Sequence, residues 1–74
     1  MAIDAKYGEI TTEKKEIPIT EPVFLIRAQD VLSGPTVRDY AILYLATTND
    51  KLGFNRIIDV ANQMDMWHFK KVPD

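Results

Sequence analysis

A chain of 74 residues is long enough for one domain and too short for two. Its 9 basic and 11 acidic residues give a net charge of −2 without clustered Lys and Arg, which excludes the basic surface typical of a nucleic-acid-binding protein. The chain has no cysteine, so disulfides and thiolate metal sites are excluded, and its single histidine, His68, is too few for a zinc site without a cluster of carboxylates.

The same composition bears on location and assembly. No stretch reaches the roughly 18 apolar residues that cross a bilayer, and the first residues lack the apolar region of a secretory signal. We therefore expect a soluble cytoplasmic protein without a membrane partner. A domain of this size buries only about 60% of the surface of its unfolded chain. Without disulfides or a metal, association of several copies is the remaining route to stability, and we predict a homo-oligomer.

The first half of the chain reads as extended structure. We expect residues 1–6 to form a flexible N-terminus and residues 7–13, which alternate weakly, to form a strand. Pro18 then marks a loop or an irregular edge strand. The strongest strand is predicted at residues 23–29, which begin with four apolar residues in succession. Such a strand needs cover on both faces, and the second cover is expected from another copy of the chain.

The first of two predicted helices covers residues 35–47. Ser33 or Gly34 is the expected cap, because Pro35 is tolerated in the first turn of a helix. One apolar stripe runs along this helix, widened by Tyr40 and Leu43, and it comprises Val37, Ala41, Tyr44 and Leu45.

The second helix is predicted at residues 54–69, after a connection at residues 51–53. Its apolar face comprises Phe54, Ile57, Ile58, Ala61 and Met64. Lys70 and Lys71 suit the negative end of its dipole. A short connection favours antiparallel neighbours. The order of strands before helices predicts one α+β domain over residues 1–74, with a small antiparallel β-sheet followed by an antiparallel two-helix hairpin.

The main candidate binding residues lie at the end of the predicted strand. Arg27 and Gln29 share one face of an extended segment, and Asp30 follows them just before a helix start. A guanidinium fork, an amide and a helix N-terminus favour a phosphate or carboxylate ligand, and Arg38 on the helix joins this set. The alternative is structural, with Arg27 in a surface salt bridge and Asp30 capping a turn.

Aromatic residues provide the second candidate feature. Tyr40, Tyr44 and Trp67 are able to stack on a planar ligand such as a base, and Tyr40 and Trp67 join the predicted ligand-binding set. Aromatic side chains at helical spacing also occur in cores and subunit interfaces, so this alternative stays open. His68 has no neighbouring nucleophile or second histidine and reads as a surface residue near a helix end.

No catalytic pattern is present in the sequence. Asp59 and Asp65 are six residues apart and do not share a helix face, so an acid–base pair is not indicated. Walker, GxSxG, HExxH and dinucleotide-binding motifs are absent as well. We therefore predict a binding protein that is not an enzyme and needs no cofactor.

One stretch resembles a group of small phage and prophage proteins. These proteins share a PVFxxRAQDxL segment, here within Glu21–Leu32, followed by a helix like Val37–Ala41 and an end like Asp65–Trp67. The resemblance covers roughly residues 21–67 and implies no reaction. Compact phage proteins of this kind often counter host defence, some as oligomers that sequester nucleotide signals and others by blocking a host protein. The expected partners are therefore further copies of the chain and a small anionic, nucleotide-like ligand, with a host protein as the alternative.

Overall fold

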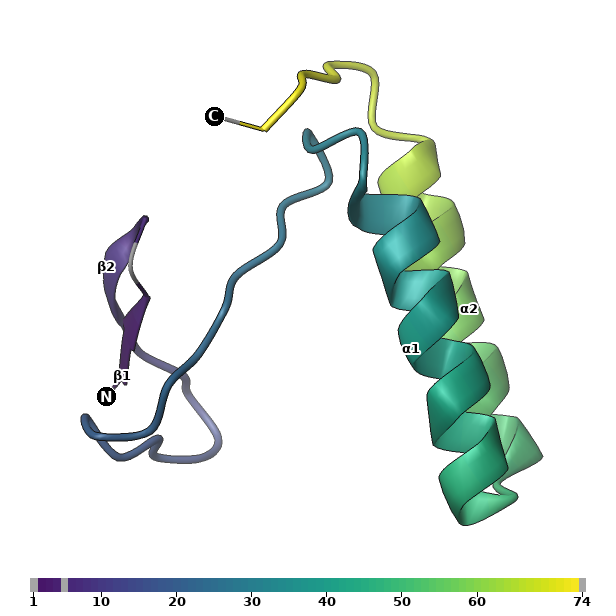
Figure 1. Ribbon diagram of the computed structural model, residues 1–74, viewed down its shortest axis with the longest axis horizontal. Helices are drawn as coiled ribbons and strands as arrows, with labels where there is room; N and C mark the ends of the chain where they lie inside the picture. Colours follow the sequence, from purple (N-terminus) through teal and green to yellow (C-terminus); the bar gives the residue numbers. More distant parts are fainter. Residues whose placement is uncertain (1, 5, 74) are drawn as a thin grey trace.

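The computed structural model describes residues 2–4 and 6–73, which form an open arch (Figure 1). The elements in chain order are β1 (Ala2–Asp4), β2 (Gly8–Ile10), α1 (Ser33–Thr48) and α2 (Lys51–Asp65). The two helices make one limb, and residues 2–4 and 6–27 make the other, which we call the N-terminal limb. Residues 28–32 and 66–73 meet between the limbs and are called the junction.

The helical limb confirms the predicted two-helix hairpin. The helices are joined only by Asn49 and Asp50, so they run antiparallel. Asn49 ends α1 in the left-handed conformation (φ 55°), and its N–H donates to the Leu45 carbonyl. Asp50 then caps α2 by accepting a hydrogen bond from the Gly53 N–H at 3.0 Å. The Asp50 N–H donates to the Thr48 hydroxyl at 3.1 Å, so backbone groups, one hydroxyl and one carboxylate together hold the reversal.

Three predicted helix boundaries are wrong. The predicted connection at residues 51–53 belongs to α2, because capping by Asp50 starts the helix at Lys51. α2 ends at Asp65, four residues before the predicted end at residue 69. α1 starts at Ser33 behind Leu32, without a side-chain cap, so neither Ser33 nor Gly34 caps it.

Small residues allow the two helices to approach closely. Ala41 and Ala61 have no exposed surface. A Cβ on Gly34 would collide with the Asp65 carboxylate, and a Cβ on Gly53 would collide with the Tyr44 hydroxyl. The packing is therefore tight at both ends of the hairpin and leaves little room for large side chains.

The N-terminal limb does not contain the predicted sheet. β1 and β2 form a short antiparallel ribbon, with Ala2 opposite Ile10 and Asp4 opposite Gly8. In the segment predicted as the strongest strand, residues 23–27 run extended (Figure 1) but join no strand among the described residues, and Ala28 and Gln29 form a turn. β2 pairs instead with the nearby β1, which closes a much shorter loop than pairing across residues 11–22 would. Gly8 has a φ of 80°, the left-handed conformation that glycine adopts freely.

The C-terminal segment crosses the junction and ties it together. Lys71 donates its backbone N–H to the Gln29 carbonyl at 2.7 Å and accepts from the Val31 N–H at 3.1 Å. The Lys70 ammonium donates to the carbonyl of Ala28 at 2.6 Å and also to that of Met64. These bonds bring residues 28–31 and the end of α2 to one place (Figure 1).

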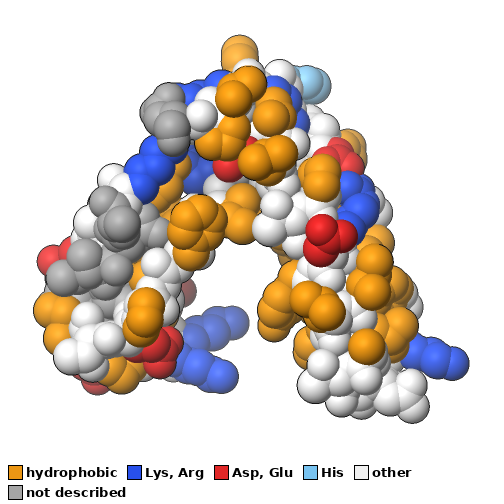
Figure 2. Space-filling model, in the orientation of Figure 1, with side chains coloured by type: hydrophobic (Ala, Val, Ile, Leu, Met, Phe, Trp, Pro, Cys, Tyr) orange, Lys and Arg blue, Asp and Glu red, His pale blue; other side chains and the backbone are white. Residues whose placement is uncertain are grey.

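Most large apolar side chains remain exposed on this arch. Figure 2 shows an open notch between the limbs and apolar side chains spread over the surface. Among the residues whose burial the structure describes, the fully covered hydrophobic residues are alanines. The large hydrophobic side chains that are at least 60% exposed are those of Phe24, Tyr40, Ile42, Leu43, Leu52, Met66, Phe69 and Val72. No helix within the described part of the chain has the length and apolar character needed to cross a membrane.

Candidate functional site

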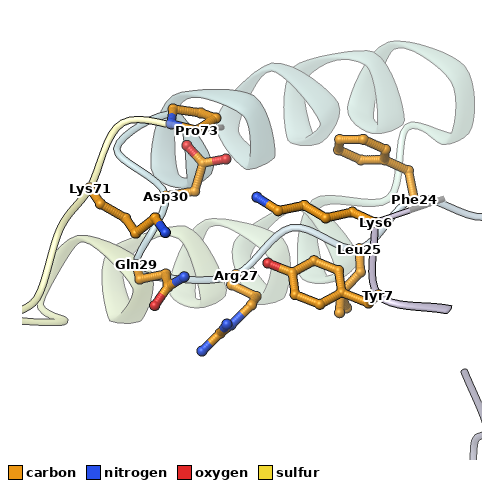
Figure 3. A pocket seen from close by; sticks show the side chains of 9 residues that line it. All are labelled: Lys6, Tyr7, Phe24, Leu25, Arg27, Gln29, Asp30, Lys71 and Pro73. Atoms are coloured by element: carbon orange, nitrogen blue, oxygen red, sulfur yellow. The ribbon is translucent and has the colours of Figure 1, made fainter. Parts of the chain in front are cut away.

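A pocket of about 250 Å³ lies beside the junction, on the side of the N-terminal limb (Figure 3). Its volume is close to the lower end of the range for small-molecule sites. Three separate parts of the chain line it: the turn between β1 and β2, the extended segment before α1, and the C-terminal segment. The lining residues are Lys6, Tyr7, Phe24, Leu25, Arg27, Gln29, Asp30, Lys71 and Pro73.

Two cations lie near one aromatic ring in this pocket. The Arg27 guanidinium is 5.7 Å from the centroid of the Tyr7 ring, and the Lys6 ammonium is 5.6 Å from it. Both distances are within the range of cation–π attraction. Arg27 is exposed and has no salt-bridge partner among the described residues, so its fork of donors is open to a ligand.

The pocket is more positive than the chain as a whole. Lys6, Arg27 and Lys71 contribute three positive charges against the single negative charge of Asp30, whereas the chain carries −2. The Asp30 carboxylate accepts a hydrogen bond from the Leu32 N–H at 2.7 Å, which holds the turn before α1. Asp30 is therefore already engaged in a turn cap, and most of the charged side chains that line the pocket are basic.

The predicted site residues separate into two groups. Arg27, Gln29 and Asp30 lie together in the pocket, at the end of the extended segment as the sequence indicated. Arg38, Tyr40 and Trp67 do not line it. The structure therefore brings together the three neighbours in sequence and leaves the helical and C-terminal candidates elsewhere.

Arg38 has a structural role within the hairpin. Its guanidinium forms a 2.5 Å salt bridge with Asp65 and donates to the Asn62 side chain at 2.9 Å, joining α1 to α2. The hydrogen bond from Arg38 lowers the pKa of Asp65. This guanidinium is therefore occupied by partners of its own chain.

The two aromatic candidates are on the surface. Tyr40 is 60% exposed on α1, with its ring 6.5 Å from that of Tyr44. Trp67 is 53% exposed just after the end of α2. His68 is exposed in the same segment, as the sequence indicated.

Sequence reasoning missed the pocket residues that lie far from Arg27 in the chain. Lys6 and Tyr7 lie at or beside a segment expected to be flexible, and Lys71 was assigned to the dipole of a helix that ends earlier. No local pattern could have joined them, because the Asp30–Lys71 bridge spans most of the chain. The described residues contain no group of three or more His, Cys, Asp or Glu side chains placed to hold a metal ion.

Comparisons with known proteins identify no relative of this chain. No family model matches this chain, and neither a curated protein nor a solved structure shows significant similarity to it.

Proposed function

We propose that this protein binds a small anionic ligand with a planar part, such as a nucleotide, in the pocket beside the junction. In this proposal the protein binds the ligand and catalyses no reaction. The observation that carries the proposal is that Lys6, Arg27 and Lys71 line one pocket together with Tyr7, in a chain that is acidic overall. Cations favour a phosphate or carboxylate, and an aromatic ring favours a planar group. Gln29, which is half-buried in the same pocket, adds directional hydrogen bonding.

The biological setting rests on the resemblance to small phage proteins. A phage-encoded oligomer in the host cytoplasm that binds a signalling nucleotide would lower the free concentration of that signal and so counter host defence. The pocket supports the ligand chemistry of this role, and the resemblance alone supports its source.

Calorimetric titration tests the binding. Nucleoside monophosphates, cyclic mono- and dinucleotides and inorganic phosphate are titrated into wild-type protein and into Arg27→Ala. We expect at least one nucleotide to bind, and Arg27→Ala to weaken it by about 1.5–3 kcal/mol, because a charge-assisted contact is removed. Arg27→Lys restores little of the affinity, since an ammonium lacks the bidentate fork.

The matched control is Arg56→Ala, which removes an exposed arginine of α2 that does not line the pocket. It leaves affinity unchanged if the pocket is the site. Equal weakening by Arg27→Ala and Arg56→Ala would show that only net charge matters and would overturn the assignment.

The second candidate function is inhibition of a host protein through an apolar helix face. The exposure of Tyr40, Ile42 and Leu43 on α1 favours it. If neither phosphate nor any of the nucleotides binds, inhibition of a host protein through this face of α1 becomes the favoured function.

A further inference from the structure

The outer face of α1 differs from that of α2. Asp39 is the last charged residue of α1, and residues 40–48 contain none. Leu43 and Tyr40 are 67% and 60% exposed there. On α2, the positions that point away from α1 at helical spacing are mostly polar, among them Arg56 and Asp59. A helix that is apolar all round is usually covered on all sides.

A hollow on α1 has the spacing of a helix-packing site. Tyr40, Leu43, Tyr44 and Thr47 are at positions i, i+3, i+4 and i+7, and together with Thr48 they line a shallow depression of about 340 Å³. Four residues at this spacing form the hole that receives one side chain of a facing helix in knobs-into-holes packing. The hydroxyl of Tyr44 donates to the Asp50 carboxylate at 2.7 Å, which fixes one wall of the hole.

The chemistry of the surface favours a second copy of this chain as the occupant. A charged partner helix would find no complementary charge between Tyr40 and Thr48. α1 itself supplies the exposed Leu43 and Tyr40 needed as knobs, so one surface carries both the knobs and the holes. A two-fold axis matches such a surface with itself. The hairpin also lacks a large buried apolar side chain of its own, because the hydrophobic residues it covers fully are Ala41 and Ala61.

We infer that α1 of one copy packs antiparallel against α1 of a second copy about a two-fold axis near Leu43. Two hairpins joined in this way form a four-helix assembly in which the two α1 helices contact each other and each α2 packs on its own α1. Tyr40 of each copy then lies near Thr47 of the other. The pocket beside the junction shares no lining residue with the hollow on α1. A test of the dimer is therefore independent of a test of ligand binding.

A matched pair of leucine substitutions tests the contact. Leu43 on α1 and Leu52 on α2 are 67% and 62% exposed, so Leu43→Lys and Leu52→Lys make the same change at similar exposure. Light scattering coupled to size exclusion is expected to give twice the chain mass for wild type and Leu52→Lys. Leu43→Lys is expected to give the mass of one chain, because two lysines would meet at the axis. A monomeric wild type at tens of micromolar, or a dimer that survives Leu43→Lys, would overturn the inference.

A cross-linking measurement covers the case in which Leu43→Lys unfolds. The chain has no cysteine, so Leu43→Cys and Leu52→Cys each introduce one thiol. Under mild oxidation, Leu43→Cys is expected to form a disulfide-linked dimer rapidly, whereas Leu52→Cys stays largely monomeric on a non-reducing gel. Equal rates for the two variants, or faster linkage through Leu52→Cys, would place the interface elsewhere or show random collision.

Discussion

The helical limb and the N-terminal limb are held together by different kinds of interaction. In the helical limb, side chains from both helices meet along the whole hairpin, from Arg38 with Asp65 at one end to Tyr44 with Asp50 at the other. In the N-terminal limb, the regular structure consists of a ribbon with three residues in each strand. The structure of the helical limb therefore follows from apolar residues repeated at helical spacing. The structure of the N-terminal limb depends on contacts with distant parts of the chain, above all at the junction.

The largest expected effect is on the packing between the helices. Ala41→Leu adds a large side chain at a position with no exposed surface, and it should lower the free energy of unfolding by about 1–3 kcal/mol. Ala46→Leu makes the same change on the exposed side of α1 and should cost little. Urea denaturation followed by circular dichroism measures both. Equal losses from the two variants would mean that the hairpin is not packed through Ala41.

An intermediate effect is expected from arginine removal in the two limbs. Arg38→Ala removes the salt bridge to Asp65 and should lower the melting temperature by less than Ala41→Leu does, because the pair is partly exposed. Arg27→Ala removes an arginine that has no salt bridge to any residue the structure describes, and it should leave the melting temperature nearly unchanged. A larger loss of melting temperature in Arg27→Ala than in Arg38→Ala would show that Arg27 stabilises the fold, and it would contradict the proposed difference between the two limbs.

The stabilisation by the Arg38–Asp65 pair depends on pH in a defined direction. Because Arg38 lowers the pKa of Asp65, this carboxylate stabilises the fold fully above its unfolded pKa of about 4. That stabilisation is lost as the pH falls through the lower pKa of the folded state. The difference in melting temperature between wild type and Arg38→Ala should therefore be present at neutral pH and disappear in acid.

The smallest effect on global stability is expected at the junction. Lys70→Ala removes the hydrogen bonds to the carbonyls of Ala28 and Met64 without touching the contact between the helices. Hydrogen exchange should become faster at the Val31 and Lys71 amides and stay unchanged within α1. Lys51→Ala, an exposed lysine at the start of α2, is the control. Faster exchange throughout α1 would show that the junction supports the hairpin as well.

The hairpin could be predicted because its signals are local. Val37, Ala41 and Leu45 repeat at helical spacing, and their pattern alone indicates a covered stripe. The end of α2 could not be placed in this way. Apolar residues continue to Phe69, but Lys70 folds back onto the Met64 carbonyl and the chain leaves the helix to reach Gln29.

The predicted strand at residues 23–29 shows a second limit. Its residues favour an extended backbone, and the backbone is extended as far as Arg27, but a strand also needs a partner. The sequence carries no local information about which segment that partner is. The candidate site follows the same rule, because Arg27, Gln29 and Asp30 are neighbours in sequence, whereas Lys6 and Lys71 join them only through the folded chain.

The position of Trp67 has a practical consequence. It is the single tryptophan of the chain, it is 53% exposed, and it lies in the junction, just after the end of α2. It lines neither the pocket nor the hollow on α1. Intrinsic fluorescence excited at the indole therefore reports on the C-terminal turn alone. A change in emission on adding a nucleotide would signal movement of that turn, and quenching by a soluble agent would follow its opening without an introduced dye.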